Sequence, residues 1–262
     1  MSTFFYLVIF LFGLLFGSFL NSVIYRLEIG GSFLKGRSYC PHCKHKLIWQ
    51  DLIPVLSFLF LKGKCRYCQK PISWQYPLVE LATGFIFLLF FLTSLNLNNF
   101  TYVYLLIMSC FLIIVFVYDL KHYIIPDKII YPAILVSGIW YLVSGIFFNL
   151  YTKYEMLNTI YSAVGAAAFF LAIVLISRGK WMGVGDIKLA FLMGLILGWS
   201  NILVALFLAF FIGAIIGIGL IATGKKTLKS EVPFGPFLVA GTFLALFWGQ
   251  NIINWYLNFF NV

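Results

Sequence analysis

The run FFYLVIFLFGLLFGSFLNSVIY (residues 4–25) contains no charged side chain. An α-helix needs about 20 apolar residues to cross the hydrocarbon core of a bilayer, which is roughly 30 Å thick. The preceding MST carries no positive charge, and the run is longer than the apolar part of a secretory signal. The run therefore predicts a permanent membrane anchor rather than a cleaved signal.

The composition extends this interpretation to the whole chain, because 63% of the residues are hydrophobic and only 10% are charged. Soluble proteins have roughly 25% charged residues. Seven further segments have the length or pattern of membrane helices: 77–97, 101–120, 128–149, 156–177, 186–199, 201–222 and 234–257. The shortest, 186–199, is interrupted by glycine. The sequence predicts an all-α integral membrane protein, a polytopic helical bundle of about eight spans.

The polar residues divide the chain into three parts. Residues 1–25 form the first span, 26–76 form a polar loop domain, and 77–262 form a multi-span bundle. With the eight spans, 17 of the 18 Lys and Arg residues fall in or beside connections on one face, leaving Lys153 on the other. Because loops rich in Lys and Arg stay in the cytoplasm, we expect the face with the 17 basic residues to be cytoplasmic and both termini to lie outside. The net charge of +10 thus indicates membrane orientation rather than nucleic-acid binding.

The loop domain contains two C-x-x-C pairs, CPHC at 40–43 and CRYC at 65–68. Two such pairs are typical of a structural zinc site with four thiolate ligands, here Cys40, Cys43, Cys65 and Cys68. The alternatives are two disulfides, which a reducing cytoplasm disfavours, or free thiols. His42 and His45 lie near enough to be rival ligands, but four sulfurs already complete the shell. We therefore expect a closed, structural zinc site.

Two acidic residues lie at ends of predicted spans on the same face. Asp119 ends one span in VYDLKHY, and Asp186 begins another in GVGDIKL. A carboxylate beside hydrocarbon is costly, so its presence there is a functional hypothesis by default. Two carboxyls a few ångströms apart share a proton, so one can activate water while the other polarises a carbonyl. Gly183 and Gly185 would leave room for a substrate backbone.

Other residues have both a functional and a plain interpretation. Glu80 lies inside a predicted span, where an acid is costly, so it is a weak functional candidate. Lys188 either moderates the charge of the two aspartates or is an ordinary cytoplasmic lysine. Pro233, Gly235 and Pro236, in PFGPF, either line a substrate groove or only start a helix. Asp127 is expected to cap a helix.

Five ordered blocks resemble the bacterial type IV prepilin peptidases, the leader peptidases and N-methyltransferases of the GxGD aspartyl protease group. They are GSFLNSVIYR (17–26), the four-cysteine stretch 38–81, YDLKHYIIPD (118–127), GVGDIKL (183–189) and VPFGPFL (232–238). The resemblance covers most of the chain. It implies that Asp119 and Asp186 are the catalytic pair, and that the four cysteines of the loop hold zinc.

The resemblance also implies a substrate and a second activity. The substrates would be prepilins or pseudopilins of pili, competence or type II secretion, with a short basic leader before an apolar membrane helix. The enzyme would remove the leader at the cytoplasmic face of the bacterial inner membrane and methylate the new N-terminus with S-adenosylmethionine. The sequence has no glycine-rich nucleotide loop on a strand, so residues that bind this cofactor are not assigned. Glu80 is a weak candidate for methyl transfer or for binding the basic leader.

Three other functions remain open at this point. A proton-coupled transporter would place acids near mid-membrane and often contains repeats, whereas these acids lie at one face and no repeat is present. A presenilin-like protease without methyltransferase activity would share the Y-D and G-x-G-D patterns, but this chain lacks a P-A-L-P block. A zinc-bearing scaffold would explain the cysteines but not Asp186 among glycines.

Overall fold

A computed structural model describes residues 3–31, 36–93, 99–146, 153–224, 227, 230 and 232–259. Among them, regular structure is helical apart from two isolated bridges, Tyr39 with Lys46 and Lys64 with Pro71. Some residues used in the sequence predictions lie outside this description: Lys35, Lys225, Lys226, Lys229 and Glu231, and the predicted span ends 94–97 and 147–149.

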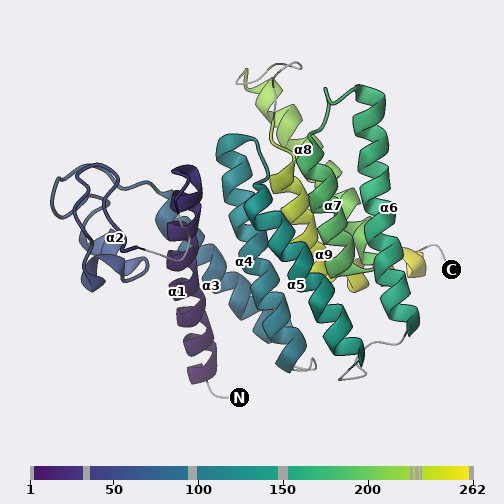
Figure 1. Cartoon of the computed structure of the whole chain (residues 1–262), viewed down its shortest axis with the longest axis horizontal. Helices are drawn as coiled ribbons and strands as arrows, with labels where there is room; N and C mark the ends of the chain where they lie inside the picture. The colour runs from purple at the N-terminus through teal and green to yellow at the C-terminus, as the bar shows by residue number, and fades with distance from the viewer. Residues whose placement is uncertain are drawn as a thin grey trace. The chain divides into compact units, whose positions relative to one another are not determined.

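The helices follow the predicted spans closely (Figure 1). They are α1 (Thr3–Glu28), α2 (Leu56–Phe60), α3 (Gln75–Thr93), α4 (Asn99–His122), α5 (Asp127–Ile146), α6 (Lys153–Ser177), α7 (Val184–Leu197), α8 (Asn201–Ala222) and α9 (Gly235–Phe259), with a 3₁₀ turn η1 (Trp49–Leu52). Seven of the described helices are long and apolar enough to cross a membrane, namely α1, α3, α4, α5, α6, α8 and α9. The prediction of an all-α, polytopic membrane protein is confirmed.

The predicted span 186–199 corresponds to α7, which is not among those seven helices. Its 14 residues rise only about 21 Å, because Gly198 ends the helix with a φ of +68°. Most of its side chains are nevertheless buried, including Leu189, Leu192 and Met193. Neighbouring helices enclose α7, and irregular backbone is tolerated at membrane depth where protein rather than lipid surrounds it.

The chain divides into two compact units, Met1–Ile114 and Val115–Val262, with the boundary inside α4. In the first unit α1 and α3 run antiparallel in close contact. A Cβ added to Gly17 would lie 2.6 Å from the Cα of Glu80, and one added to Gly13 would lie 2.7 Å from the Cα of Gly84. Glycine is therefore required at both positions. In membranes, helix association depends on such close backbone packing, since lipid supplies no hydrophobic force between helices.

The second unit packs its helices by the same means. A Cβ on Gly194 of α7 would collide with the backbone of Ala163 in α6, and one on Gly241 of α9 would collide with Ala205 in α8. Tyr141 of α5 donates a hydrogen bond of 2.6 Å to the carbonyl of Leu195 in α7. Helix α7 contacts α5, α6, α8 and α9, so neighbouring helices surround it.

Replacing Gly17 with alanine should force α1 away from α3. We expect the free energy of unfolding to fall by about 1–3 kcal/mol, the usual cost of overpacking. The measurement is thermal melting of the purified protein in detergent. Gly165→Ala in α6 is the matched control, because nothing lies within 4 Å of its added Cβ. Equal melting of the two variants would contradict the packing described here.

Candidate active site and metal centre

The four cysteines of the loop domain come together. Their sulfur atoms all lie within 4.8 Å of one another, and the Sγ atoms of Cys40 and Cys68 are 3.9 Å apart. Four sulfurs bound at about 2.3 Å from one tetrahedral ion would be separated by about 3.8 Å. The cluster can therefore hold one metal ion.

Each C-x-x-C pair is built by the same backbone turn. The N–H of Cys40 donates to the carbonyl of His45 and the N–H of Lys44 donates back to Cys40, both at 2.9 Å. In the second pair Cys65 and Gln69 occupy the places of Cys40 and Lys44, with distances of 2.9 and 3.0 Å. Lys44 and Gln69 both have positive φ, 58° and 57°. The chain thus forms two copies of one knuckle.

The two knuckles are joined by side chains around Asp51. Its carboxylate accepts hydrogen bonds from Arg66 Nε at 2.8 Å and from the Tyr67 hydroxyl at 3.1 Å. The same carboxylate accepts a bond of 3.3 Å from the N–H of Ile48, the residue before η1. The ring of His45 stacks on Tyr67 with centroids 3.7 Å apart.

Hydrogen bonds also tune the Cys40 thiol. Burial alone would raise its pKa, but hydrogen bonds from the backbone N–H groups of Cys43 and His42 outweigh this effect. Together with bonds from neighbouring thiols they lower the pKa of Cys40 to about 7. A thiolate forms readily in this environment, and the thiolate is the form that binds a metal.

In the second unit, Asp119 lies near the end of α4 with only 5% of its surface exposed. Its carboxylate accepts a hydrogen bond from the backbone N–H of Gly235, the first residue of α9. A Cβ added to Gly235 would lie 2.6 Å from Asp119 Oδ2. Glycine in the PFGPF segment therefore allows the start of α9 to approach this carboxylate.

Asp186 lies in the first turn of α7, where it is 8% exposed. Its Oδ2 accepts a hydrogen bond of 3.1 Å from the N–H of Gly183, the N-cap residue. Gly185 fits against Ile125 of the α4–α5 connection, since an added Cβ would lie 3.0 Å from the Cβ of Ile125. The two glycines of G-x-G-D thus have separate structural roles, one as donor and one for close packing.

The two aspartates are near enough for the charge of Asp119 to act electrostatically on Asp186. Each accepts a bond from a glycine N–H, at the same end of the bundle where α4 ends and α7 and α9 begin. This arrangement offers two buried carboxyl groups, and the backbone bonds hold each in a set orientation. Such a pair can take a proton from water with one group and donate a proton with the other.

Lys188 lies two residues after Asp186 in sequence but contacts other groups. Its Nζ is 2.5 Å from Asp127 Oδ1 and lies over the ring of Tyr131, 4.8 Å from the centroid. Asp127 is the first residue of α5, and its role as a helix cap stays a prediction. Pro233 precedes α9 and Pro236 lies in its first turn. A supporting role for Lys188 and the two prolines at the active site stays a prediction.

Glu80 is buried in α3 and serves the fold of the first unit. Its Oε2 accepts a hydrogen bond of 2.7 Å from the backbone N–H of Val55, and Ser18 also donates to the carboxylate. The sequence shows an acid inside a predicted span but does not indicate that Val55 and Ser18 bind it. Tertiary packing brings these two donors to the carboxylate. Participation of Glu80 in leader binding or methyl transfer stays a prediction.

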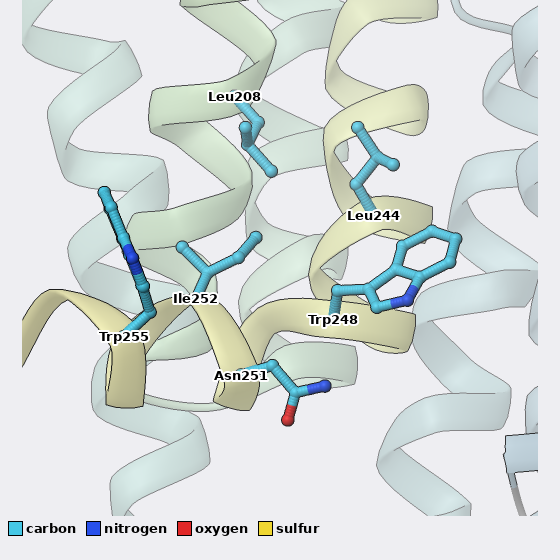
Figure 2. A pocket seen from close by; sticks show the side chains of 6 residues that line it. All are labelled: Leu208, Leu244, Trp248, Asn251, Ile252 and Trp255. Atoms are coloured by element: carbon cyan, nitrogen blue, oxygen red, sulfur yellow. The ribbon is translucent and has the colours of Figure 1, made fainter.

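A hollow of about 420 Å³ lies between α8 and α9, away from the aspartates. Figure 2 shows that α9 changes direction along this hollow, between Leu244 and Trp255. Its lining contains no ionisable group: Leu208, Leu244, Trp248, Asn251, Ile252 and Trp255. Trp248 lies 13 residues beyond Gly235, or about 20 Å along a helix, so the hollow is not part of the carboxylate site.

Comparison with known proteins gives two family matches. Residues 11–94 match the Bacterial Peptidase A24 N-terminal domain, and residues 106–218 match the Type IV leader peptidase family. No solved structure matches the chain.

Similar curated proteins cover nearly the whole chain and carry the name prepilin leader peptidase/N-methyltransferase. The protein from Aeromonas hydrophila is 34% identical over 284 residues, which is 97% of this chain and 94% of that protein. The protein from Bacillus subtilis is 35% identical over 254 residues, 95% of this chain and 97% of that protein. The one from Legionella pneumophila is 33% identical, covering 98% and 96%. On these matches, the chain belongs to the type IV leader peptidase family.

Proposed function

We propose that this protein is a membrane-embedded aspartyl endopeptidase that removes the leader of type IV prepilins or pseudopilins and methylates the new N-terminus. The observation that carries the proposal is the pair of buried carboxyls, Asp119 and Asp186, each held by a glycine N–H at one end of the bundle. The names of similar proteins support both activities.

The chemistry follows from two carboxyls that share one proton. The ionised group takes a proton from water, and the resulting hydroxide oxygen attacks the scissile carbonyl carbon. The protonated group donates its proton to the carbonyl oxygen. The tetrahedral intermediate then collapses and the C–N bond breaks. The leaving amine takes a proton from the carboxyl that accepted it from water, and a hydroxyl of the intermediate returns its proton to the other carboxylate, which restores the starting pair. The order of roles between Asp119 and Asp186 is interchangeable in this scheme.

The substrate is proposed to enter from the membrane. A prepilin has a basic leader followed by an apolar helix, so its cleavage site lies at the membrane edge. The basic residues of this chain favour a cytoplasmic location for the same end of the bundle, in the bacterial inner membrane.

S-adenosylmethionine would supply the methyl group for the new N-terminus. None of the described residues forms a strand with a glycine-rich nucleotide loop. The cofactor would therefore bind between helices and the loop domain.

We further propose that the metal of the loop domain is zinc. Four thiolates at these distances suit its tetrahedral preference and leave no open position for chemistry. The ion would therefore be structural. It would hold the two knuckles together, because among the described residues of the 26–76 loop only Cys40, Pro54, Phe58 and Cys65 are buried.

Replacing Asp119 or Asp186 with asparagine should abolish leader cleavage while preserving the fold. Asparagine keeps an oxygen for the glycine N–H but cannot transfer the proton, so we expect a loss of at least about 10²-fold in rate. The measurement is cleavage of a purified prepilin in detergent or vesicles. Methylation of an already cleaved pilin should survive both changes.

Asp127→Asn is the matched control, since Asp127 pairs with Lys188 instead of the other aspartates. We expect it to retain most of its cleavage activity. Near-normal cleavage by folded Asp186→Asn, or loss of methylation together with cleavage, would contradict the assignment.

Gly235→Ala should also impair cleavage, because the added Cβ would displace the Asp119 carboxylate from the N–H that orients it. We expect a lower kcat for the prepilin substrate with methylation preserved. Gly217→Ala in α8 has open space around its added Cβ and should behave like the unmodified protein. Equal kcat values for the two variants would show that Gly235 does not position Asp119.

Purified protein should contain about one zinc per chain. Cys43→Ser should lose the metal and lower the melting temperature of the loop domain, whereas Cys110→Ser in α4 should keep the metal. Elemental analysis and melting with and without a chelator measure both effects. Absence of zinc with the four cysteines paired as disulfides would refute the proposal.

A further inference from the structure

The segment after η1 lies beside the membrane helices rather than beyond their ends. Three contacts set the register of α1 and α3: Gly13 faces Gly84, Gly17 faces Glu80, and Asn21 donates to the carbonyl of Tyr76 at 3.0 Å. The N–H of Val55 donates to Glu80 Oε2 at 2.7 Å. Val55 is thereby held near the second turn of α3. In Figure 1, α2 correspondingly lies level with the body of α1 and not past its end.

This position is at membrane depth. The 19 described residues of α3 rise about 28 Å, close to the roughly 30 Å thickness of a hydrocarbon core. Glu80 lies five residues after Gln75, about 8 Å along the helix. Because a glutamate side chain leans toward the start of its helix, Val55 lies somewhat nearer the interface than Glu80 does. That depth matches the 5–10 Å at which interfacial helices lie.

The backbone at Val55 is consistent with a firmly held segment. Val55 has φ 60° and ψ −49°, a conformation that a β-branched residue rarely adopts. Its N–H is paired with a carboxylate that is only 7% exposed. Where water is scarce, an unpaired N–H would be costly, and the buried Glu80 carboxylate avoids that cost by accepting the Val55 N–H.

Beyond Val55, α2 presents an apolar surface that no part of the described chain covers. Phe58 points inward, packing on Trp74 with ring centroids 4.9 Å apart. Phe60 is 82% exposed, and Leu56 and Leu59 are exposed beside it. Two tryptophans border this surface, Trp49 and Trp74, exposed by 71% and 69%. Tryptophan is enriched where bilayer and water meet.

We propose that Trp49, Leu56, Leu59, Phe60 and Trp74 form a membrane-interface face that lies against the acyl chains of the nearer leaflet. Lipid is the occupant that fits, because the element is tethered at membrane depth and has exposed lysines beyond its apolar side chains. Lys62 and Lys64 lie two and four residues after Phe60, are exposed, and would meet anionic headgroups. The loop domain is then a surface-bound element rather than a solvated loop. This inference does not depend on the proposed enzyme activity.

Photo-crosslinking tests the proposal in the full-length protein. Phe60 is replaced by the photoreactive residue p-benzoylphenylalanine, and the zinc-loaded protein is placed in vesicles of phosphatidylethanolamine and phosphatidylglycerol. After irradiation, mass spectrometry of peptides should find lipid adducts at position 60. The yield should be comparable with that at Phe207, an exposed residue within the span of α8. The matched control is Gln69, an exposed polar residue of the second knuckle, which should give few adducts.

Glu80 variants test whether the hydrogen bond sets the depth. Glu80→Gln keeps an oxygen for the Val55 N–H and should preserve the adducts at position 60, whereas Glu80→Ala should reduce them severalfold. Melting curves show that each variant is folded. Adducts at Phe207 but none at position 60 in the otherwise unmodified protein would overturn the proposal. Crosslinking of position 60 to a protein chain instead of lipid would overturn it too.

Discussion

A polar group that is removed from water must find its partner within the protein, and much of this structure depends on that constraint. Three buried carboxylates satisfy it in the same way, by accepting a hydrogen bond from a backbone N–H. Asp119 uses Gly235, Asp186 uses Gly183, and Glu80 uses Val55. In each case a helix carries the acid and a non-helical residue or a helix start supplies the donor. Asp119 and Glu80 therefore connect separate segments, whereas Asp186 caps its own helix, and each bond orients its carboxylate.

The same contact has different consequences in the two units. For Glu80 it holds a loop beside a helix, and a single buried carboxylate has no partner with which to share a proton. For Asp119 and Asp186 it brings two carboxyls into mutual influence at the place where three helices begin or end. The N-cap bond of Asp186 would by itself be a structural role. The neighbouring acid, which capping does not require, is what the proposed chemistry of two carboxyls sharing a proton depends on.

Glycine makes these arrangements possible by letting backbones approach closely. Gly17 and Gly13 bring α1 against α3, and Gly194 brings α7 against α6. Gly235 belongs to the same group, except that its neighbour is a carboxylate rather than a backbone. Both the packing of the helices and the position of Asp119 therefore depend on the absence of a Cβ at these glycines. This explains why a helix as short as α7 can be buried at the centre of its unit.

The sequence by itself determined the class of the protein, most helix positions, the four-cysteine site and the two aspartates. These features depend on local sequence or on the number of spans. The length of an apolar run indicates a span and the C-x-x-C spacing indicates a knuckle. The order of the spans predicts that Asp119 and Asp186 lie on one face. Only the tertiary structure decided which groups those residues meet. That Lys188 pairs with Asp127, that Gly235 donates to Asp119, and that Val55 is held by Glu80 all depend on helix packing between residues distant in sequence. The short α7 is a further case, because burial by neighbouring helices, which apolar length does not encode, accounts for its place in the bundle.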